Sequence, residues 1–222
     1  SAGQTEPDGP VDVRAATALG TEALRGHVAG ILSLDVDAAG LDAVGRRDPA
    51  VAALLQRYPG RRPVCFGTPF EAAAWAVISQ RIRMAQAAQT KARMASALGE
   101  AVEVDGHAVH AFPAPAALAG LEQFPGLWPA KAQRLRALAR AADDGALDPA
   151  LLRGLPVPEA LAHLEALPGL GPWSAALVLV RGAGHPDIAP MAAKRSVCMA
   201  FCCAALRSVM SCPTASKAGA PW

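Results

Sequence analysis

The chain has 222 residues, of which 52% are hydrophobic, and its formal net charge is +2. This length can bury a sizeable core in one large or two small domains. The longest uncharged stretches are too short, or too interrupted by Pro and Gly, to cross a bilayer, so we expect no membrane protein.

The first ten residues, SAGQTEPDGP, are polar and contain no apolar segment. We expect them to be disordered and to form neither a signal peptide nor a membrane anchor, which favours a cytoplasmic protein. The segment ILSLDVD, residues 31–37, alternates apolar and polar side chains, which predicts the last strand of a small N-terminal sheet. A single strand is not stable alone, so residues 1–48 hold either a reduced sheet or a helical start.

The rest of the chain is rich in alanine, has few β-branched runs and is interrupted by Pro or Gly at short intervals, which predicts a mostly helical protein. The clearest helix start is Thr68, which is followed by Pro69 and, three residues on, by Glu71. These residues predict a capping box with Thr68 as N-cap. On this helix we expect Trp75 to belong to the core.

Basic side chains gather in the middle of the sequence. Residues 57–140 contain eleven basic and five acidic side chains, whereas residues 1–56 contain four basic and eight acidic ones. Two helical regions hold four basic residues each, namely Arg81, Arg83, Lys91 and Arg93, and then Lys131, Arg134, Arg136 and Arg140. Such clusters attract phosphate in a salt-dependent manner, although a solvated helix face gives the same pattern.

Residues 164–182, LEALPGLGPWSAALVLVRG, predict two helices joined by a tight turn. Pro168 ends the first helix, and Pro172 suits the first position of the second. Between them, Gly169 and Gly171 allow the backbone conformations of a tight turn. The free N–H groups at such a helix start form an anion site that fits a DNA phosphate. The alternative is a turn that only joins two packed helices.

Several further motifs accompany this hairpin. They are FEAAAWAVISQ at 70–80, AFPAPAAL at 111–118, KAQRLRALARAADDG at 131–145, RG at 181–182 and PDIAP at 186–190. In this order and spacing they resemble the helix-hairpin-helix DNA glycosylases, and among them the bacterial 3-methyladenine DNA glycosylase II type. The resemblance implies a mostly α fold of two helical lobes with a DNA groove between them. It places a glycosylase core at residues 49–195, with the hairpin at 164–182.

The resemblance also implies an activity. An enzyme of this family is a DNA-repair N-glycosylase, which turns its target nucleotide out of the duplex and cleaves the bond between base and sugar. The implied partner is double-stranded DNA with alkylated purines such as 3-methyladenine, bound by a monomer without a cofactor. Alkylated purines carry positive charge that weakens the glycosidic bond, so a carboxylate that stabilises charge on the sugar and helps water attack is sufficient.

Three groups of site residues follow from the resemblance. The base pocket is assigned to Trp173, Gln80 and Arg81, and the DNA contacts to Gly169, Gly171, Ser174 and Val102. To these DNA contacts we add Lys131, from the second basic cluster. Among these, Val102 lies in an expected loop that enters the duplex. Trp173 stands where strand-cutting members have a Lys, which indicates a monofunctional enzyme, although a packed core Trp is the alternative. A monovalent cation, Na⁺ or K⁺, is assigned to the backbone carbonyls of Glu165, Leu167 and Leu170.

The expected catalytic Asp falls twenty residues after Trp173, where this sequence has Ala193. Asp187 lies nearby but matches a different, usually structural residue of the pattern, so it is only a fallback. Without a carboxylate at position 193 we expect impaired cleavage, because loss of a catalytic carboxylate costs orders of magnitude in rate.

Residues 196–222 depart from the family pattern as a cysteine-rich tail that contains Cys198, Cys202, Cys203 and Cys212. The spacing of these cysteines differs from that of the iron–sulfur ligands of some relatives. Two alternatives to an active glycosylase remain. One is a catalytically silent binder of damaged or bent duplex, and the other is a protein that uses the hairpin only for assembly or non-specific DNA contact.

Overall fold

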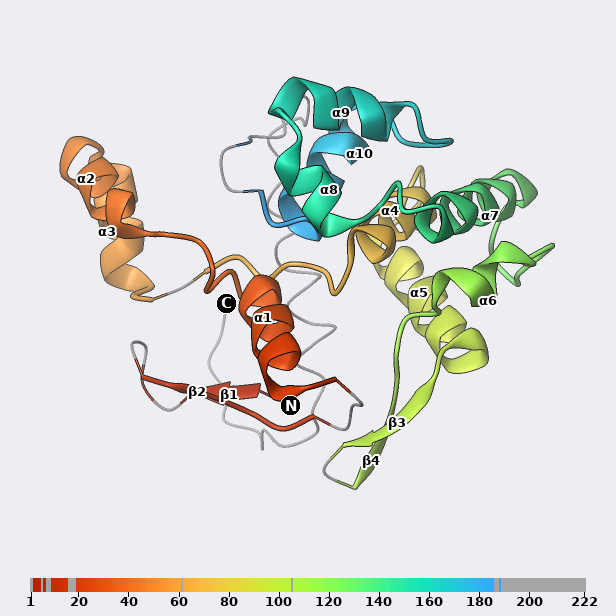
Figure 1. Cartoon of the computed structure of the whole chain (residues 1–222), viewed down its shortest axis with the longest axis horizontal. Coiled ribbons are helices and arrows are strands. Elements are labelled where there is room, and N and C mark those ends of the chain that lie inside the picture. Colours follow the sequence, from red (N-terminus) through yellow and green to blue (C-terminus); the bar gives the residue numbers. More distant parts are fainter. Residues whose placement is uncertain are drawn as a thin grey trace.

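The computed structural model of the chain describes residues 2–4, 6, 9–15, 19–60, 62–104, 106–185 and 188. Within these residues the fold is mostly helical, with two small antiparallel sheets of two strands each (Figure 1). The predicted fold class is confirmed. In the described part of the chain, no helix is long and apolar enough to cross a membrane.

The N-terminal part combines a small sheet with three helices. Strands β1 (Ala2–Gln4) and β2 (Val11–Val13) pair antiparallel, and α1 (Thr21–Ile31), α2 (Ala39–Arg47) and α3 (Pro49–Arg57) follow. The strand predicted at residues 31–37 was wrong, because Ile31 ends α1 and a turn comes next. The N–H group of Leu34 bonds back to the carbonyl of Ala29 at 2.8 Å, so this apolar segment closes a helix instead of pairing with a strand.

One helix, α4 (Pro69–Ile78), lies at the centre of the fold. It starts as predicted, because Oγ1 of Thr68 accepts the N–H of Glu71 at 3.1 Å, while the Glu71 carboxylate accepts the N–H of Gly67 at 3.1 Å. Every residue of α4 except Glu71 is buried, including Trp75. The helices packed around it are α5 (Met84–Leu98), α7 (Pro129–Asp143), α10 (Pro172–Leu177) and the π-helix η1 (Val178–Gly182).

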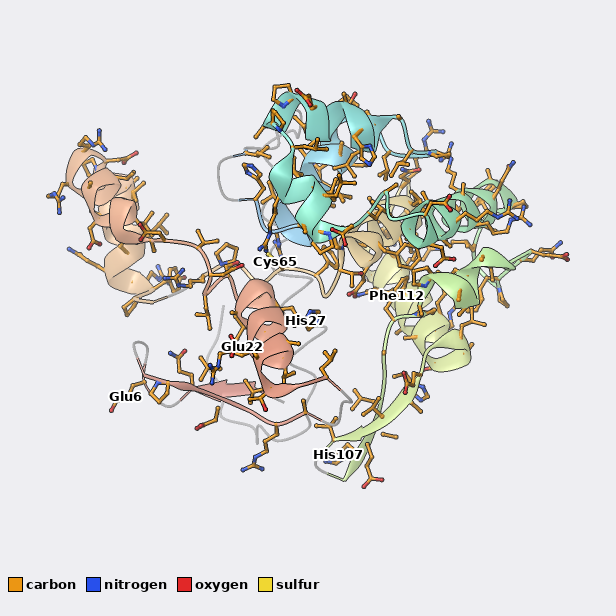
Figure 2. The ribbon with its side chains drawn as sticks, in the orientation of Figure 1. Glu6, Glu22, His27, Cys65, His107 and Phe112 are labelled. Atoms are coloured by element: carbon orange, nitrogen blue, oxygen red, sulfur yellow. The ribbon has the colours of Figure 1, made fainter. Side chains whose placement is uncertain are left out.

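The remaining elements form two groups that meet at α4 (Figure 1). Between α5 and α7 the chain forms the hairpin β3 (Ala101–Val104) and β4 (His107–His110), and then α6 (Pro115–Ala119), which packs on α7. On the other side α8 (Pro149–Gly154) and α9 (Val157–Glu165) precede α10. Figure 2 shows Phe112 at the base of the β3–β4 hairpin and His107 at its far end. The Phe112 ring lies 6.2 Å from that of Phe70, so the base of the hairpin is anchored on α4.

Two close approaches fix the end of η1 against the rest of the core. A Cβ at Gly182 would lie 2.8 Å from Cα of Pro69 and 2.9 Å from Cβ of Ala72, so η1 and α4 approach too closely for any side chain there. The guanidinium of the neighbouring Arg181 is buried and donates to the carbonyl of Val64. The Arg-Gly motif therefore serves the packing of η1 on α4 and on the segment before it.

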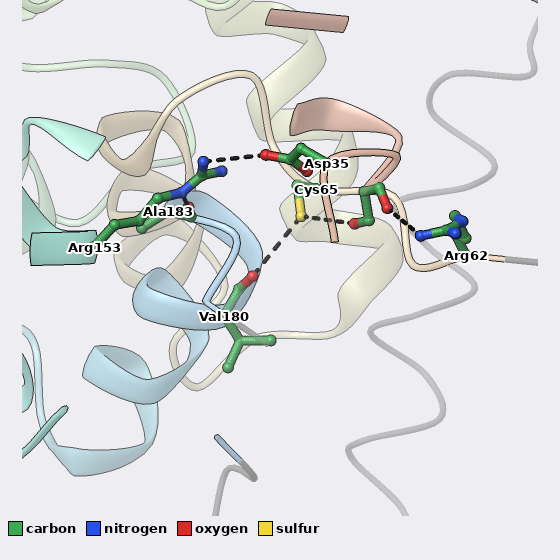
Figure 3. Close-up of polar contacts among 7 residues, drawn as sticks. Asp35, Arg62, Cys65, Arg153, Val180 and Ala183 are labelled. Carbon is green, nitrogen blue, oxygen red and sulfur yellow. Dashed lines mark hydrogen bonds and ion pairs between the residues drawn. The ribbon is translucent and has the colours of Figure 1, made fainter. Parts of the chain in front are cut away.

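The N-terminal part is tied to the core by a few polar contacts (Figure 3). Arg153 of α8 forms an ion pair with Asp35 at 3.1 Å and donates to the carbonyl of Ala183. Arg62 donates to the carbonyls of Ser33 at 2.7 Å and Val36 at 2.6 Å. These contacts hold the turn after α1 against α8 and against the segment that leads into α4.

Candidate nucleic-acid interface

The predicted helical hairpin is present, with α9 before its turn and α10 after it. In the turn, Leu170 donates its N–H to the carbonyl of Leu167 at 3.2 Å, and Gly169 has a φ of +91°. Gly171 is the extended N-cap of α10, and Pro172 takes the first helical position, as the sequence predicts. Because α10 runs directly into η1, the second helical segment continues to the end of η1.

The two turn glycines have different surroundings. A Cβ at Gly169 would lie 2.7 Å from Cδ of Arg134 and 3.3 Å from Cγ2 of Val77, whereas a Cβ at Gly171 would have no atom within 4 Å. The positive φ therefore favours glycine at position 169, whereas the exposed side chain of Arg134 can move away from an added Cβ. At Gly171 the backbone is open, so another molecule can reach it closely.

The side-chain amide of Gln80 joins the hairpin to two helices. Its Nε2 donates to the carbonyl of Gly169 at 2.8 Å, and its Oε1 accepts from Nη1 of Arg134 in α7 at 2.8 Å. Gln80 itself comes directly after the C-cap of α4. The hairpin turn, the end of α4 and the start of α7 are thus held as one unit.

Lys131 supports the same unit from within. Its side chain is buried, and its Nζ donates to the carbonyls of Ile78 and Gln80, both at 2.7 Å. Burial lowers the pKa of the Lys131 ammonium below its ordinary value, and the nearby charge of Arg134 lowers this pKa further. The structure thus uses at least two of the three N–H donors of Lys131 to fix the backbone that follows α4.

A pocket of about 610 Å³ opens between these three segments, which we call the hairpin pocket. It is lined by residues 80–82 after α4, by Trp128, Ala130, Lys131 and Arg134 at the start of α7, and by residues 169–171 of the hairpin turn. Its volume lies within the range of about 300–1,000 Å³ that is typical of ligand sites. Arg81 and Arg134 place two positive charges in its lining, which suits an anion.

Arg81 has an unusual backbone conformation. Its φ is +56°, which is the left-handed region that non-glycine residues rarely adopt, and its side chain is exposed. The contacts of Gln80 and Lys131 hold the backbone just before it. Strain of this kind persists only where neighbouring contacts impose it, and it concentrates at functional sites.

The structure brings some of the predicted site residues together. Gln80, Arg81, Lys131, Gly169 and Gly171 all line the hairpin pocket, and so does Leu170. Trp173 is half-buried against the core and is not among the residues that line this pocket. Ser174 is buried in α10.

Other predicted residues lie elsewhere. Val102 stands in strand β3 opposite Val109, so the loop expected there is a strand, and it does not line the hairpin pocket. Ala193, Asp187 and the four cysteines of residues 198–212 lie outside the described residues.

The assigned cation ligands are backbone carbonyls at the end of α9 and in the turn. The carbonyl of Leu167 already accepts one N–H, from Leu170, and a carbonyl oxygen has a second lone pair for a cation. The cation site therefore stays a prediction for Glu165, Leu167 and Leu170.

Three residues that line the hairpin pocket were not predicted from the sequence, namely Ile82, Trp128 and Ala130. Trp128 lines its rim with 71% of the residue exposed. The available signal was a Trp directly before the Pro that begins α7, at a position where N-capping residues are expected.

Comparison with known proteins gives relatives by structure alone. No protein-family model matches the chain, and no curated protein matches it by sequence. The chain is similar to the 3-methyladenine DNA-glycosylase from Archaeoglobus fulgidus, with a TM-score of 0.65, 27% identity and coverage of 76% of this chain. It spans 58% of the length of that archaeal protein.

Two bacterial proteins show the same fold. One is the 8-oxoguanine glycosylase/lyase of Clostridium acetobutylicum in complex with double-stranded DNA, with a TM-score of 0.63, 19% identity and coverage of 89% of this chain and 67% of that one. The other is the DNA-3-methyladenine glycosidase of Bacillus halodurans, with a TM-score of 0.51, 15% identity and coverage of 69% of this chain and 68% of that one. At these identities the likeness establishes the fold.

Proposed function

Because the chain has the fold of the helix-hairpin-helix DNA glycosylases, we propose that it is a DNA-repair N-glycosylase acting on duplex DNA as a monomer. One observation carries the proposal. The open backbone at Gly171 lies in the same pocket as the guanidinium groups of Arg81 and Arg134. Backbone N–H groups at a helix start and flexible cations together suit a DNA phosphate.

The hairpin pocket binds the DNA backbone in this proposal. Fixed N–H groups position the duplex, and the arginines add attraction that depends on salt and not on sequence. The hydrogen bonds of Gln80 and Lys131 fix the hairpin turn relative to the segment after α4. A phosphate bound at the turn therefore also determines where the duplex lies relative to Arg81.

The preferred lesion is an alkylated purine such as 3-methyladenine. The likeness to the Archaeoglobus fulgidus 3-methyladenine DNA-glycosylase supports this choice. The cationic base of such a lesion is a good leaving group, so the enzyme needs to stabilise only the charge that develops on the sugar. The Trp at position 173, where strand-cutting members of the family have a Lys, favours a monofunctional enzyme.

Catalysis depends on position 193. The family places its catalytic Asp there, and this chain has Ala193. Base release by the chain is therefore slow, because no carboxylate at that position stabilises the developing charge. Ala193 also favours the second candidate function, a catalytically silent protein that binds damaged duplex.

The experiment is single-turnover release of 3-methyladenine from methylated duplex DNA by the chain and by an Ala193→Asp variant. Release that rises by orders of magnitude with Asp supports the glycosylase and the role of position 193. Equal release by both proteins means that another group, with Asp187 the next to replace, does the chemistry. No release by either protein, combined with selective binding to an abasic duplex, favours the silent binder.

A further inference from the structure

A second pocket, of about 600 Å³, opens between the N-terminal helices and the core, and we call it the N-terminal pocket. One wall is formed by the turn after α1 and by α2 and α3, and the other by the segment before α4 and by the end of η1. The N-terminal pocket thus lies before the start of α4, whereas the hairpin pocket lies after the end of that helix. Its volume is also typical of ligand sites.

Ser33 is a strained residue in the lining of this pocket. Its φ is +53°, and Ser33 and Arg81 are the two non-glycine residues with a positive φ in the described part of the chain. Each of them lines one of the two pockets. The Ser33 hydroxyl donates to the carbonyl of Pro63 at 2.7 Å, so a contact with the core holds the strained turn. Strain of this kind concentrates at functional sites.

Arg62 is a half-buried cation in the same lining, and it makes no ion pair with a described residue. Figure 3 shows it beside the turn after α1, where its Nη1 donates to the carbonyls of Ser33 at 2.7 Å and Val36 at 2.6 Å. The Nε and Nη2 groups of Arg62 remain, and this side of a guanidinium is a fork that binds a carboxylate through two hydrogen bonds. Because a buried charge is normally paired, Arg62 indicates an anionic ligand.

His185 offers a further polar group to this pocket. Its Nδ1 is buried and has no hydrogen-bond partner in the described part of the chain. A buried ring nitrogen without a partner costs free energy, and an oxygen of a bound ligand would remove that cost by accepting an N–H from Nδ1.

The wall opposite these polar groups is apolar. It includes Leu41 and Val44 of α2 and Leu55 of α3. Leu41 and Val44 are 42% and 41% exposed, so a ligand that covers them removes apolar surface from water. The pocket therefore suits a molecule with an anionic group at one end and a hydrocarbon body at the other.

Two carboxylates also line the N-terminal pocket, namely Asp37 and Asp42. Both residues are exposed, whereas Arg62 and His185 are half-buried. Water and salt weaken the effect of an exposed charge more than that of a buried one. The inner part of the pocket thus favours an anion over a cation.

We propose that the N-terminal pocket binds a small amphipathic carboxylate. The carboxylate group pairs with the Nε and Nη2 fork of Arg62 and accepts from Nδ1 of His185, and the hydrocarbon body lies along α2 and α3. This site is independent of the proposed function, because the N-terminal pocket shares no lining residue with the hairpin pocket.

The experiment is isothermal titration calorimetry of the full chain with butanoate, hexanoate and octanoate. Octan-1-ol, which lacks the charge, and inorganic phosphate, which lacks the hydrocarbon body, are the control ligands. The variants are Arg62→Lys and Gly40→Leu, with Gly26→Leu as the matched control. Gly40 and Gly26 both lie in helices where an added Cβ has no atom within 4 Å, but Gly40 lines the N-terminal pocket and Gly26 does not.

We expect octanoate to bind most tightly, and removal of two CH₂ groups to weaken binding by up to about fifteenfold. Arg62→Lys should weaken octanoate binding by roughly tenfold to a hundredfold, because Lys keeps the charge and a donor for the carbonyls but lacks the fork. Gly40→Leu should also weaken it, since the new side chain fills part of the pocket, and Gly26→Leu should leave it unchanged.

A chain that does not bind octanoate would overturn the proposal, and so would binding of octan-1-ol or phosphate as tight as that of octanoate. A folded Arg62→Lys protein with unchanged octanoate affinity would overturn it too. If Arg62→Lys does not fold, Gly40→Leu decides, and unchanged affinity in that variant counts against the site. Binding of DNA at the hairpin pocket is unaffected in every case, so these outcomes are distinct from a failure of the proposed function.

Discussion

The two glycines of the hairpin turn give a matched pair of substitutions, because the same added methyl group should damage folding at one position and DNA binding at the other. We expect Gly169→Ala to lower the free energy of unfolding and Gly171→Ala to lower DNA affinity. Gly120→Ala, at an open position outside the hairpin pocket, is the control.

The cost at position 169 comes from its backbone conformation. Its φ of +91° is unfavourable for any side chain by roughly 1–2 kcal/mol. The new Cβ would also lie 2.7 Å from Cδ of Arg134, but that side chain is exposed and flexible, so it can move aside. A cost of about 1–2 kcal/mol corresponds to a fall in Tm of roughly 2–8 °C for a domain of this size.

The cost at position 171 is much smaller for folding. Its backbone is extended and a Cβ has no atom within 4 Å, so no strain arises. Ala is a poorer N-cap residue than Gly, but it also lowers the conformational entropy of the unfolded chain. The two effects oppose each other, so the free energy of unfolding should change by no more than about 1 kcal/mol. A methyl group between the turn and a phosphate removes charge-assisted hydrogen bonds of about 1.5–3 kcal/mol, so binding should weaken roughly tenfold to a hundredfold.

The assay is thermal unfolding followed by fluorescence anisotropy with labelled duplex DNA. A fully folded Gly171→Ala protein that binds DNA as well as the unsubstituted chain and the Gly120→Ala control would contradict a phosphate contact at the turn. A Gly169→Ala protein with an unchanged Tm would show that the positive φ at position 169 does not require glycine.

Three further substitutions test the supporting contacts. Lys131→Met removes an ammonium that holds two carbonyls, so the free energy of unfolding from urea denaturation at pH 7 should fall by roughly 2–5 kcal/mol. Because burial lowers the Lys131 pKa in the folded state, the unfolded chain binds more protons between that pKa and 10.5. The free energy of unfolding should therefore rise with pH through that window in the unsubstituted chain, and this rise should be absent in Lys131→Met. Equal pH dependence of the two proteins would contradict the lowered pKa of Lys131. Arg134→Ala should weaken DNA binding uniformly across sequences and reduce the salt slope of log Kd by about one, whereas an unchanged slope would remove Arg134 from the phosphate contacts. Gly182→Ala should lower the Tm, since its Cβ would lie 2.8 Å from Pro69 and 2.9 Å from Ala72; an unchanged Tm would show that η1 can move.

Local sequence signals predicted the parts of the fold that depend on local chemistry. Thr68 caps α4, and Pro172 begins α10 as expected. These features follow from the fixed φ of proline and from the hydrogen-bonding capacity of a capping side chain, which act within a few residues. The burial of Trp75 was also predicted, since it lies on an apolar helix.

The secondary-structure predictions were wrong where the structure depends on contacts between residues that are far apart in the sequence. The alternation at residues 31–37 suggested a strand, but no second strand pairs with it in the described residues, and the segment closes α1 instead. Val102 was expected to lie in a loop, yet it belongs to β3 and stands opposite Val109 of β4. A strand is stable only when it pairs with another strand, and its own sequence does not identify that second strand.

The same limit applies to the site. Gln80 and Gly169 are far apart in the sequence, so no pattern predicted that the amide of one would bond to the carbonyl of the other. Lys131 was read as a phosphate contact from its place in a basic cluster, although its burial against two carbonyls depends on the packing of α7 on α4. Trp128 was missed because exposure is a property of the folded chain.

The most direct test of the proposed function is the affinity of the unmodified chain for a duplex with one abasic-site analogue, compared with the same duplex intact. This comparison does not depend on the residue at position 193, since only binding is measured. We expect clearly tighter binding of the abasic duplex, because extruding an abasic nucleotide costs no unstacking or unpairing of a base. Equal affinity for both duplexes would contradict the proposed function and leave the hairpin as a non-specific DNA contact.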